Sequence, residues 1–129
     1  SASLHGQPED SYPYYSGYVE ETGEGDGAGC NFNFPMPPGT RYETWAQALN
    51  EAIFHIQKFS AEALIVSLGV DTYKEDPISF FCLETSDYLQ CGKQLSQLNL
   101  PTVFVLEGGY ALQMVAQNVA NVLIGFEDG

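Results

Sequence analysis

The stretch AEALIVSLGVDTYKEDP (residues 61–77) decides the fold class of this chain. Residues 63–70 form a nearly continuous run of small and branched apolar side chains, and Asp71 ends it. An apolar run of this length without polar alternation is typical of a parallel β-strand that is covered on both faces. The run therefore predicts a buried parallel strand that leads directly into a carboxylate.

Asp71 has two interpretations at this position. A carboxylate that leaves a buried strand is costly unless it is paired, hydrogen-bonded or bound to a metal. Asp71 could bind a ligand, or it could begin a turn over DTYKEDP that Asp76 closes before Pro77. The spacing alone leaves both interpretations open.

A second buried strand is predicted at residues 101–109, PTVFVLEGG, where two glycines end it. Apolar residues at helical spacing predict three helices, over residues 41–59, 86–98 and 111–125. This alternating order predicts an α/β fold of three layers (α/β/α) with a mainly parallel sheet. Residues 41–129 are therefore expected to form one helix–strand–helix–strand–helix unit.

Local signals mark the expected helix starts and the expected buried faces. Thr40 and Glu43 have the T-x-x-E spacing of a capping box, and Thr85 is the expected cap of the second helix. The face of the third helix that is expected to point inward comprises Val115, Val119, Val122, Leu123 and Phe126.

The first forty residues are organised differently. Residues 1–5 are expected to form a short strand, and residues 6–40 are rich in Gly, Pro and Tyr and are expected to be irregular. Irregular segments of this length are uncommon and are often functional. The tyrosines argue against simple disorder, because they offer surface area to bury.

Composition excludes some classes of function. The formal charge is −13, so nucleic-acid phosphates would be repelled and a cationic ligand is favoured. No apolar run approaches the roughly 20 residues of a membrane helix. The three cysteines are odd in number and form no CxxC pair, which is typical of a reduced, cytoplasmic protein. Cys82 and Cys91 are expected to fill the core.

The two predicted strands end in residues that can carry chemistry. Ligands bind parallel α/β sheets beyond the carboxyl ends of the strands. If the two strands are neighbours, Asp71 and Tyr110 reach the same rim, and His5 could join them. Tyr110 is equally consistent with a packed aromatic residue, since the two glycines before it indicate only a sharp bend or a close approach.

The order of the motifs resembles that of the zinc-dependent histone deacetylase family. The similarity is strongest to the acetylpolyamine amidohydrolases and the class II-like deacetylases, which carry EGGY where other members have only glycines. It implies an arginase/deacetylase-like fold of which this chain is the C-terminal half. The matching segments are SLHGQP, YPYYSGYVEETGEGDGAGCNFNFPMPPGT, SLGVDTYKEDPISFFCLETSDY and PTVFVLEGGYAL.

The resemblance also implies roles for individual residues. Asp71 matches a ligand of the catalytic zinc, and Tyr110 matches the tyrosine that hydrogen-bonds the substrate carbonyl. Ser3 and Leu4 match positions that hold a monovalent cation such as potassium. Residues 1–40 then supply a strand end and a channel-lining loop. The residues that match the walls of the acyl channel are Tyr14, Tyr15, Ile78, Gly108 and Gly109.

The chain departs from the family in lacking the half that carries a histidine pair and two zinc ligands in an Asp-x-His motif. Its two histidines are His5 and His55, and His55, alone on its helix, is expected to be a packing or surface residue. The resemblance therefore implies a hydrolase of acetylated polyamine or acetyl-lysine that is inactive alone. It would act as a fragment of a longer enzyme or with a complementing chain.

Two hypotheses about a non-catalytic function remain open. The chain could be a self-associating half-domain that forms a homo-oligomer and serves binding or assembly. It could instead bind polyamines or other cations through an acidic loop, which comprises Glu20, Glu21, Glu24 and Asp26.

Overall fold

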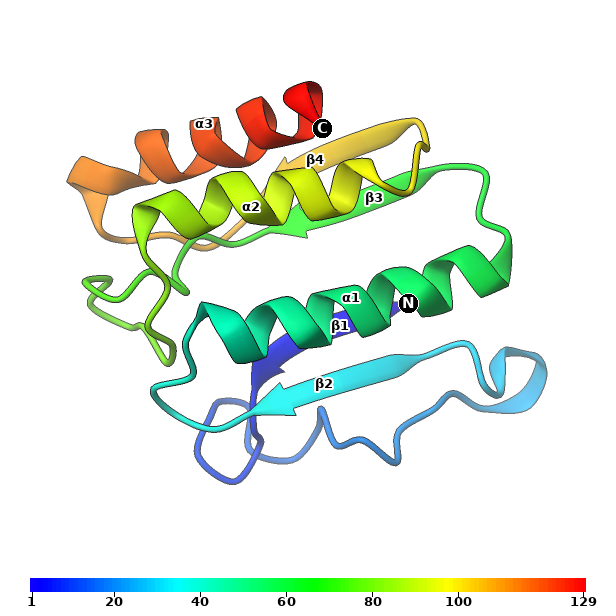
Figure 1. Cartoon of the computed structure of the whole chain (residues 1–129). Helices are drawn as coiled ribbons and strands as arrows, with labels where there is room; N and C mark the ends of the chain where they lie inside the picture. The colour runs from blue at the N-terminus through cyan, green and yellow to red at the C-terminus, as the bar shows by residue number, and fades with distance from the viewer.

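A computed structural model describes all of residues 1–129 (Figure 1). It contains four strands, three α-helices and one short 3₁₀ helix. In chain order these are β1 (Ala2–Gly6), η1 (Gly25–Gly27), β2 (Phe32–Met36), α1 (Tyr42–Phe59), β3 (Leu64–Leu68), α2 (Thr85–Ser96), β4 (Thr102–Leu106) and α3 (Leu112–Asp128).

The strands form two separate parallel pairs, β1 with β2 and β3 with β4. All four strands run in the same direction (Figure 1). The predicted neighbourhood of the strands at 63–70 and 101–109 is confirmed, since Leu64 lies opposite Thr102 and Leu68 opposite Leu106. No hydrogen-bonded ladder joins β1 to β3, so each of these strands has one edge without a strand partner.

The strand β2 contradicts the expectation that residues 6–40 are irregular. Its sequence FNFPM contains a proline, which removes a donor and usually argues against a strand. The pairing nevertheless places Pro35 opposite His5 in regular register, because β2 has a strand partner on only one side. Edge strands tolerate a proline, and the sequence offered no sign that β2 is one.

The helices pack against one face of the strand pairs. Leu4, Leu64 and Phe104 reach from the strands into the core, where they contact side chains of α1, α2 and α3. On the opposite face Ile65 is 75% exposed and Val103 is 60% exposed. Residues 1–129 therefore supply two layers, one of strands and one of helices.

Two buried clusters hold these layers together. One cluster lies between the rim of β3 and the helices α2 and α3, and the other lies between α1 and α2. Trp45 and Leu4 contact both clusters, so the core is continuous from β1 to α3. The fully buried apolar members of the first cluster are Met36, Val70, Tyr73, Phe81, Leu83, Tyr88 and Val122.

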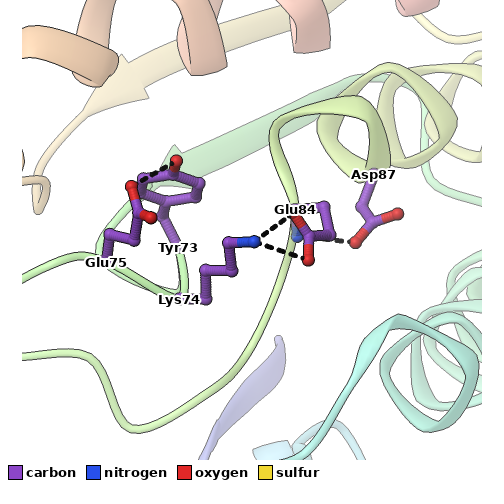
Figure 2. Close-up of polar contacts among 5 residues, drawn as sticks. All are labelled: Tyr73, Lys74, Glu75, Glu84 and Asp87. Carbon is purple, nitrogen blue, oxygen red and sulfur yellow. Dashed lines mark hydrogen bonds and ion pairs between the residues drawn. The ribbon is translucent and has the colours of Figure 1, made fainter.

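Both predicted helix caps are wrong. The Thr40 hydroxyl donates to the Pro37 carbonyl at 2.7 Å and stabilises a turn, and α1 begins without a side-chain cap. The start of α2 is capped one residue earlier than expected, by Glu84 and Asp87 (Figure 2). Asp87 accepts the backbone N–H of Glu84 at 2.7 Å, and the Glu84 side chain also pairs with Lys74.

Other predictions for the core have mixed outcomes. Cys91 is buried as expected, and burial raises the pKa of its thiol to about 12, whereas Cys82 is only half-buried. On α3, Val122 is buried and Val115 and Val119 pack against the core as expected, whereas Leu123 is exposed. None of the helices combines the length and apolar character that a membrane crossing requires.

Candidate active site

The carboxyl ends of β3 and β4 bring Asp71 and the segment Glu107–Tyr110 to one rim. Backbone pairing continues past the strands, because the Val70 N–H donates to the Gly108 carbonyl at 2.9 Å. A Cβ atom at Gly108 would overlap the Asp71 carboxylate. Only glycine allows this approach, so Gly108 lies directly against Asp71.

Asp71 is a half-buried carboxylate without a cationic partner. The only salt bridge in residues 1–129 joins Lys74 to Glu84. Burial, followed by the negative charges of Asp76 and Glu107, raises the pKa of Asp71 above its ordinary value. An unpaired carboxylate in acidic surroundings is stabilised by a cation, so this position favours a positively charged ligand or a metal ion.

Tyr110 lies on the same rim, and its backbone is fixed while its side chain is exposed. Gly109 precedes it with φ of 140°, and a Cβ at Gly109 would lie 2.7 Å from Val70 Cγ2. The Tyr110 side chain is 52% exposed, and no protein group hydrogen-bonds its hydroxyl. The phenol O–H is therefore free to donate to a bound ligand, and the alternative of a packed aromatic residue is not what the structure shows.

Asp76 is a rim residue whose role the sequence did not reveal. The expectation that it closes a turn is correct in part, because its Oδ1 accepts the Ile78 N–H at 3.0 Å. Its Oδ2 also accepts the N–H groups of Tyr110 at 2.6 Å and Ala111 at 3.0 Å. A buried aspartate before proline was the available signal, but no local pattern identifies partners more than thirty residues away.

The expected channel residues lie at or near the rim but do not enclose a channel within residues 1–129. Tyr14 and Tyr15 belong to the loop between β1 and β2 and are 61% and 79% exposed, and Ile78 is 62% exposed. Phe80 links this region to the rim, since it closely approaches Gly6 at the end of β1. The channel assignment stays a prediction.

His5 does not join Asp71 and Tyr110. Its Nδ1 lies 2.8 Å from the Ser3 hydroxyl, and its Nε2 lies 2.8 Å from the Gly17 carbonyl oxygen. Nδ1 thus contacts a neighbour within β1, and Nε2 holds the loop that carries the tyrosines. A Cβ at Gly17 would lie 2.6 Å from His5 Nε2, so the loop fits this contact only with glycine.

Leu4, an expected monovalent-cation position, and His55, an expected packing or surface residue, both make structural contacts. The side chain of Leu4 lies in the core, and His55 stacks on Phe32 with ring centroids 3.9 Å apart, as expected for a packing residue. No group of three His, Cys, Asp or Glu side chains in residues 1–129 is arranged to hold a metal ion. Asp71 is therefore at most one ligand of a larger set.

An apolar cavity of about 690 Å³ separates β1 from β3. Residues of both strands line it, and side chains of α1 and α2 form its floor. Asp71, Thr72 and Glu107 lie along the same cavity. The partnerless edges of β1 and β3 thus border a space that continues to the rim.

Comparisons with known proteins show the family of this chain. Residues 1–126 match the family described as histone deacetylase domain, and the chain belongs to this family. It is 50% identical over 126 residues to acetylpolyamine amidohydrolase 1 of Pseudomonas aeruginosa, covering 98% of this chain and 36% of that protein. It is 49% identical over 124 residues to acetylpolyamine amidohydrolase of Mycoplana ramosa, covering 96% and 36%.

Solved structures confirm the fold. An acetylpolyamine aminohydrolase from Burkholderia pseudomallei superposes with a TM-score of 0.93 at 36% identity, covering 97% of this chain and 36% of that one. A histone deacetylase homologue complexed with SAHA gives 0.86 at 31% identity, covering 98% and 34%. The α/β fold with parallel strands and the partial match are confirmed: the chain spans about a third of the length of these relatives.

Proposed function

We propose that residues 1–129 supply one side of the active site of a zinc-dependent hydrolase of acetylated amines. The observation that carries the proposal is the pairing of two strand ends. One end presents an unpaired, half-buried Asp71, and the neighbouring end presents Tyr110 with a free hydroxyl. These two groups suit the ligand and the hydrogen-bond donor that hydrolysis of an amide requires.

The donor chemistry of Asp71 fits zinc as a single ligand. Catalytic zinc takes three protein ligands and keeps one position open. When bound, the metal polarises the amide carbonyl and makes its water a stronger nucleophile at neutral pH. Asp71 contributes one carboxylate, and the remaining ligands and the proton-transferring histidines come from a segment outside residues 1–129, on the same or another chain.

Tyr110 stabilises the carbonyl oxygen of the substrate. Its O–H donates to that oxygen as negative charge develops during attack on the carbonyl carbon. Gly109 and the start of α3 fix the Tyr110 backbone, so the donor needs little reorganisation during the reaction. The resemblance to the family supports a place for Gly108 and Gly109 in the wall of the acyl channel, where Gly108 lies directly against Asp71.

A cationic amine is the substrate class that the surroundings favour. The chain carries a net charge of −13, and the exposed rings of Tyr14 and Tyr15 offer faces that attract an ammonium group. The relatives named acetylpolyamine amidohydrolase support an acetylated polyamine, with acetyl-lysine as the alternative. Ser3 and Leu4 are proposed to hold a monovalent cation such as potassium, and the location is proposed to be cytoplasmic.

A second candidate function is self-association as a non-catalytic half-domain. The exposed face of Ile65 and Val103 and the partnerless edges of β1 and β3 favour it, because such surfaces promote pairing. The two functions differ in a measurable way. Light scattering of residues 1–129 gives a homo-oligomer for the second function, whereas the first function needs a different segment to cover these edges.

A chimera tests the first function. Residues 1–129 replace the matching third of the Mycoplana ramosa protein, and zinc content and hydrolysis of an acetylated polyamine are measured. Asp71→Asn is expected to lower the zinc content strongly. Tyr110→Phe is expected to keep zinc and to lower kcat by about a hundredfold to a thousandfold, as removal of an oxyanion donor does.

The matched controls are Glu9→Gln and Tyr12→Phe, which alter an exposed carboxylate and an exposed tyrosine of the β1–β2 loop. Both controls should retain zinc and turnover. A folded chimera that binds no zinc contradicts the proposal, and so does a Tyr110→Phe variant with unchanged kcat.

A further inference from the structure

One buried carboxylate connects the two loops that form the rim. Asp76 is 6% exposed and accepts three backbone N–H groups, from Ile78, Tyr110 and Ala111. It takes part in no salt bridge. The hydrogen bonds of this side chain are therefore all made to backbone N–H groups, three of which converge on its two oxygens.

The first consequence concerns the start of α3. Ala111 is the N-cap residue of this helix, and its own side chain forms no cap. Asp76, 35 residues earlier, accepts the Ala111 N–H and takes the place of a local cap. Because it also accepts the Tyr110 N–H, the backbone on both sides of the Tyr110 carbonyl is fixed to a different loop.

The second consequence concerns the opposite side of the rim. The other oxygen of Asp76 holds the Ile78 N–H, and the Asp76 carbonyl accepts the N–H of Ser79 at 3.1 Å. Ile78 and Tyr110 keep exposed side chains above these fixed backbones. A single carboxylate thus sets the distance between two rim residues that lie 32 positions apart in the sequence.

We propose that Asp76 is a positioning residue for Tyr110: by binding the backbone N–H groups on both sides of the rim, it places the Tyr110 hydroxyl over the reacting carbonyl. This inference rests on the proposed function. A displacement of about 1 Å in a reacting group lowers turnover by about a hundredfold. Loss of the Asp76 contacts should therefore appear in kcat and not in substrate binding.

Asp87 provides a matched control, because it is also a carboxylate that accepts a backbone N–H at a helix start, but on α2 (Figure 2). Asp76→Asn keeps the size of the side chain and places an NH₂ group against one of the three N–H donors. In the chimera, per zinc-loaded molecule, Asp76→Asn is expected to lower kcat about thirtyfold with KM changed by less than about threefold. Asp87→Asn should leave both within about twofold.

A double substitution separates positioning from a general loss of structure. If Asp76 acts through the Tyr110 hydroxyl, Asp76→Asn lowers kcat by less than about twofold when Tyr110 is already Phe. The same loss in both backgrounds overturns the proposal. In Asp76→Ser the hydroxyl can still accept one N–H, so its kcat should lie between that of Asp76→Asn and that of the unsubstituted protein. This variant replaces Asp76→Asn in the test if Asp76→Asn does not fold.

A readout without catalysis distinguishes failure of this inference from failure of the proposed function. Amide hydrogen exchange of Ile78, Tyr110 and Ala111 in the chimera should accelerate together by about tenfold or more in Asp76→Asn and remain unchanged in Asp87→Asn. Unchanged exchange at these amides overturns the positioning role. An unaltered kcat of Tyr110→Phe refutes the proposed function instead, and with it the catalytic part of this proposal.

Discussion

The two strand pairs end in different ways. At the carboxyl end of β3 and β4, the loops 69–84 and 107–111 are held by a buried carboxylate, by two close glycine contacts and by the start of α3. At the carboxyl end of β1, the long loop to β2 exposes Tyr12, Tyr14 and Tyr15 and is held by polar contacts to His5, Asn31 and Asn33.

This difference shows how differently the two parts of the site are held. The β3–β4 rim carries the groups proposed to meet the reacting atoms, and a buried carboxylate and close glycine contacts hold its backbone. The β1–β2 loop carries the aromatic side chains proposed to guide a substrate, and exposed or half-buried polar contacts hold it. A site that needs one fixed geometry and a broad entrance can obtain both from two ends of the same sheet.

The largest expected effect is that of Gly109→Ala. Its φ of 140° strains any side chain, and the new Cβ would lie 2.7 Å from Val70 Cγ2, so the free energy of unfolding should fall by about 3 kcal/mol. Gly29→Ala is the control in the β1–β2 loop, because Gly29 also has a positive φ of 77° but has nothing within 4 Å of its Cβ position. Gly29→Ala should lower the free energy of unfolding by about 1 kcal/mol.

Urea unfolding of both variants measures this contrast. Equal losses for Gly109→Ala and Gly29→Ala would show that the two regions are equally tolerant, which contradicts the comparison between a fixed rim and an adaptable loop.

His5→Ala is expected to have an intermediate effect. It removes the contact of Nε2 with the Gly17 carbonyl and should lower the free energy of unfolding by about 1 kcal/mol. Limited proteolysis should then cut the loop around Gly17 faster, while amide exchange at Tyr110 stays the same. His55→Ala, which removes a stacking histidine elsewhere, is the control and should not accelerate that cleavage. Faster exchange at Tyr110 would show that the two regions are coupled.

Lys74→Ala should have the smallest effect. The Lys74–Glu84 pair is close, at 2.8 Å, but both side chains are well exposed to water (Figure 2). Exposed pairs of this kind contribute little and are screened by salt. Thermal unfolding of Lys74→Ala should match that of the unsubstituted chain at physiological salt. A clear drop would mean that the β3–β4 rim depends on this surface pair as well as on its buried contacts.

The sequence predicts the regular half of the molecule well because its patterns are local. The run 63–70 and the helical spacing of 41–59 lie close to β3 and α1 as observed. Both strand pairs are parallel, but only β3 and β4 have the continuous apolar runs that reveal it. The strand β2 was missed because its five residues include Pro35, and its pairing with β1 is a contact across about thirty residues.

The site was predictable to the extent that strand ends define it. Asp71 and Tyr110 follow directly from two apolar runs, and their common rim follows from neighbouring strands. The role of Asp76 did not follow, because its partners at Tyr110 and Ala111 are set by tertiary structure. The helix caps failed for local reasons: the Thr40 hydroxyl donates to the Pro37 carbonyl in the preceding turn, and Glu84 and Asp87 cap α2 one residue before Thr85.

The cavity between β1 and β3 has a mechanical consequence. No ladder crosses it, so α1 and α2 form the bridge between the two strand pairs, with Gln94 bound to Tyr42, Ala46 and Asn50. The relative position of the two strand pairs therefore depends on side-chain contacts between two helices and not on a backbone ladder. Under the proposed function, the packing of α1 against α2 also decides how the β1–β2 loop faces Asp71, so damage to this helix contact would disturb the site from a distance.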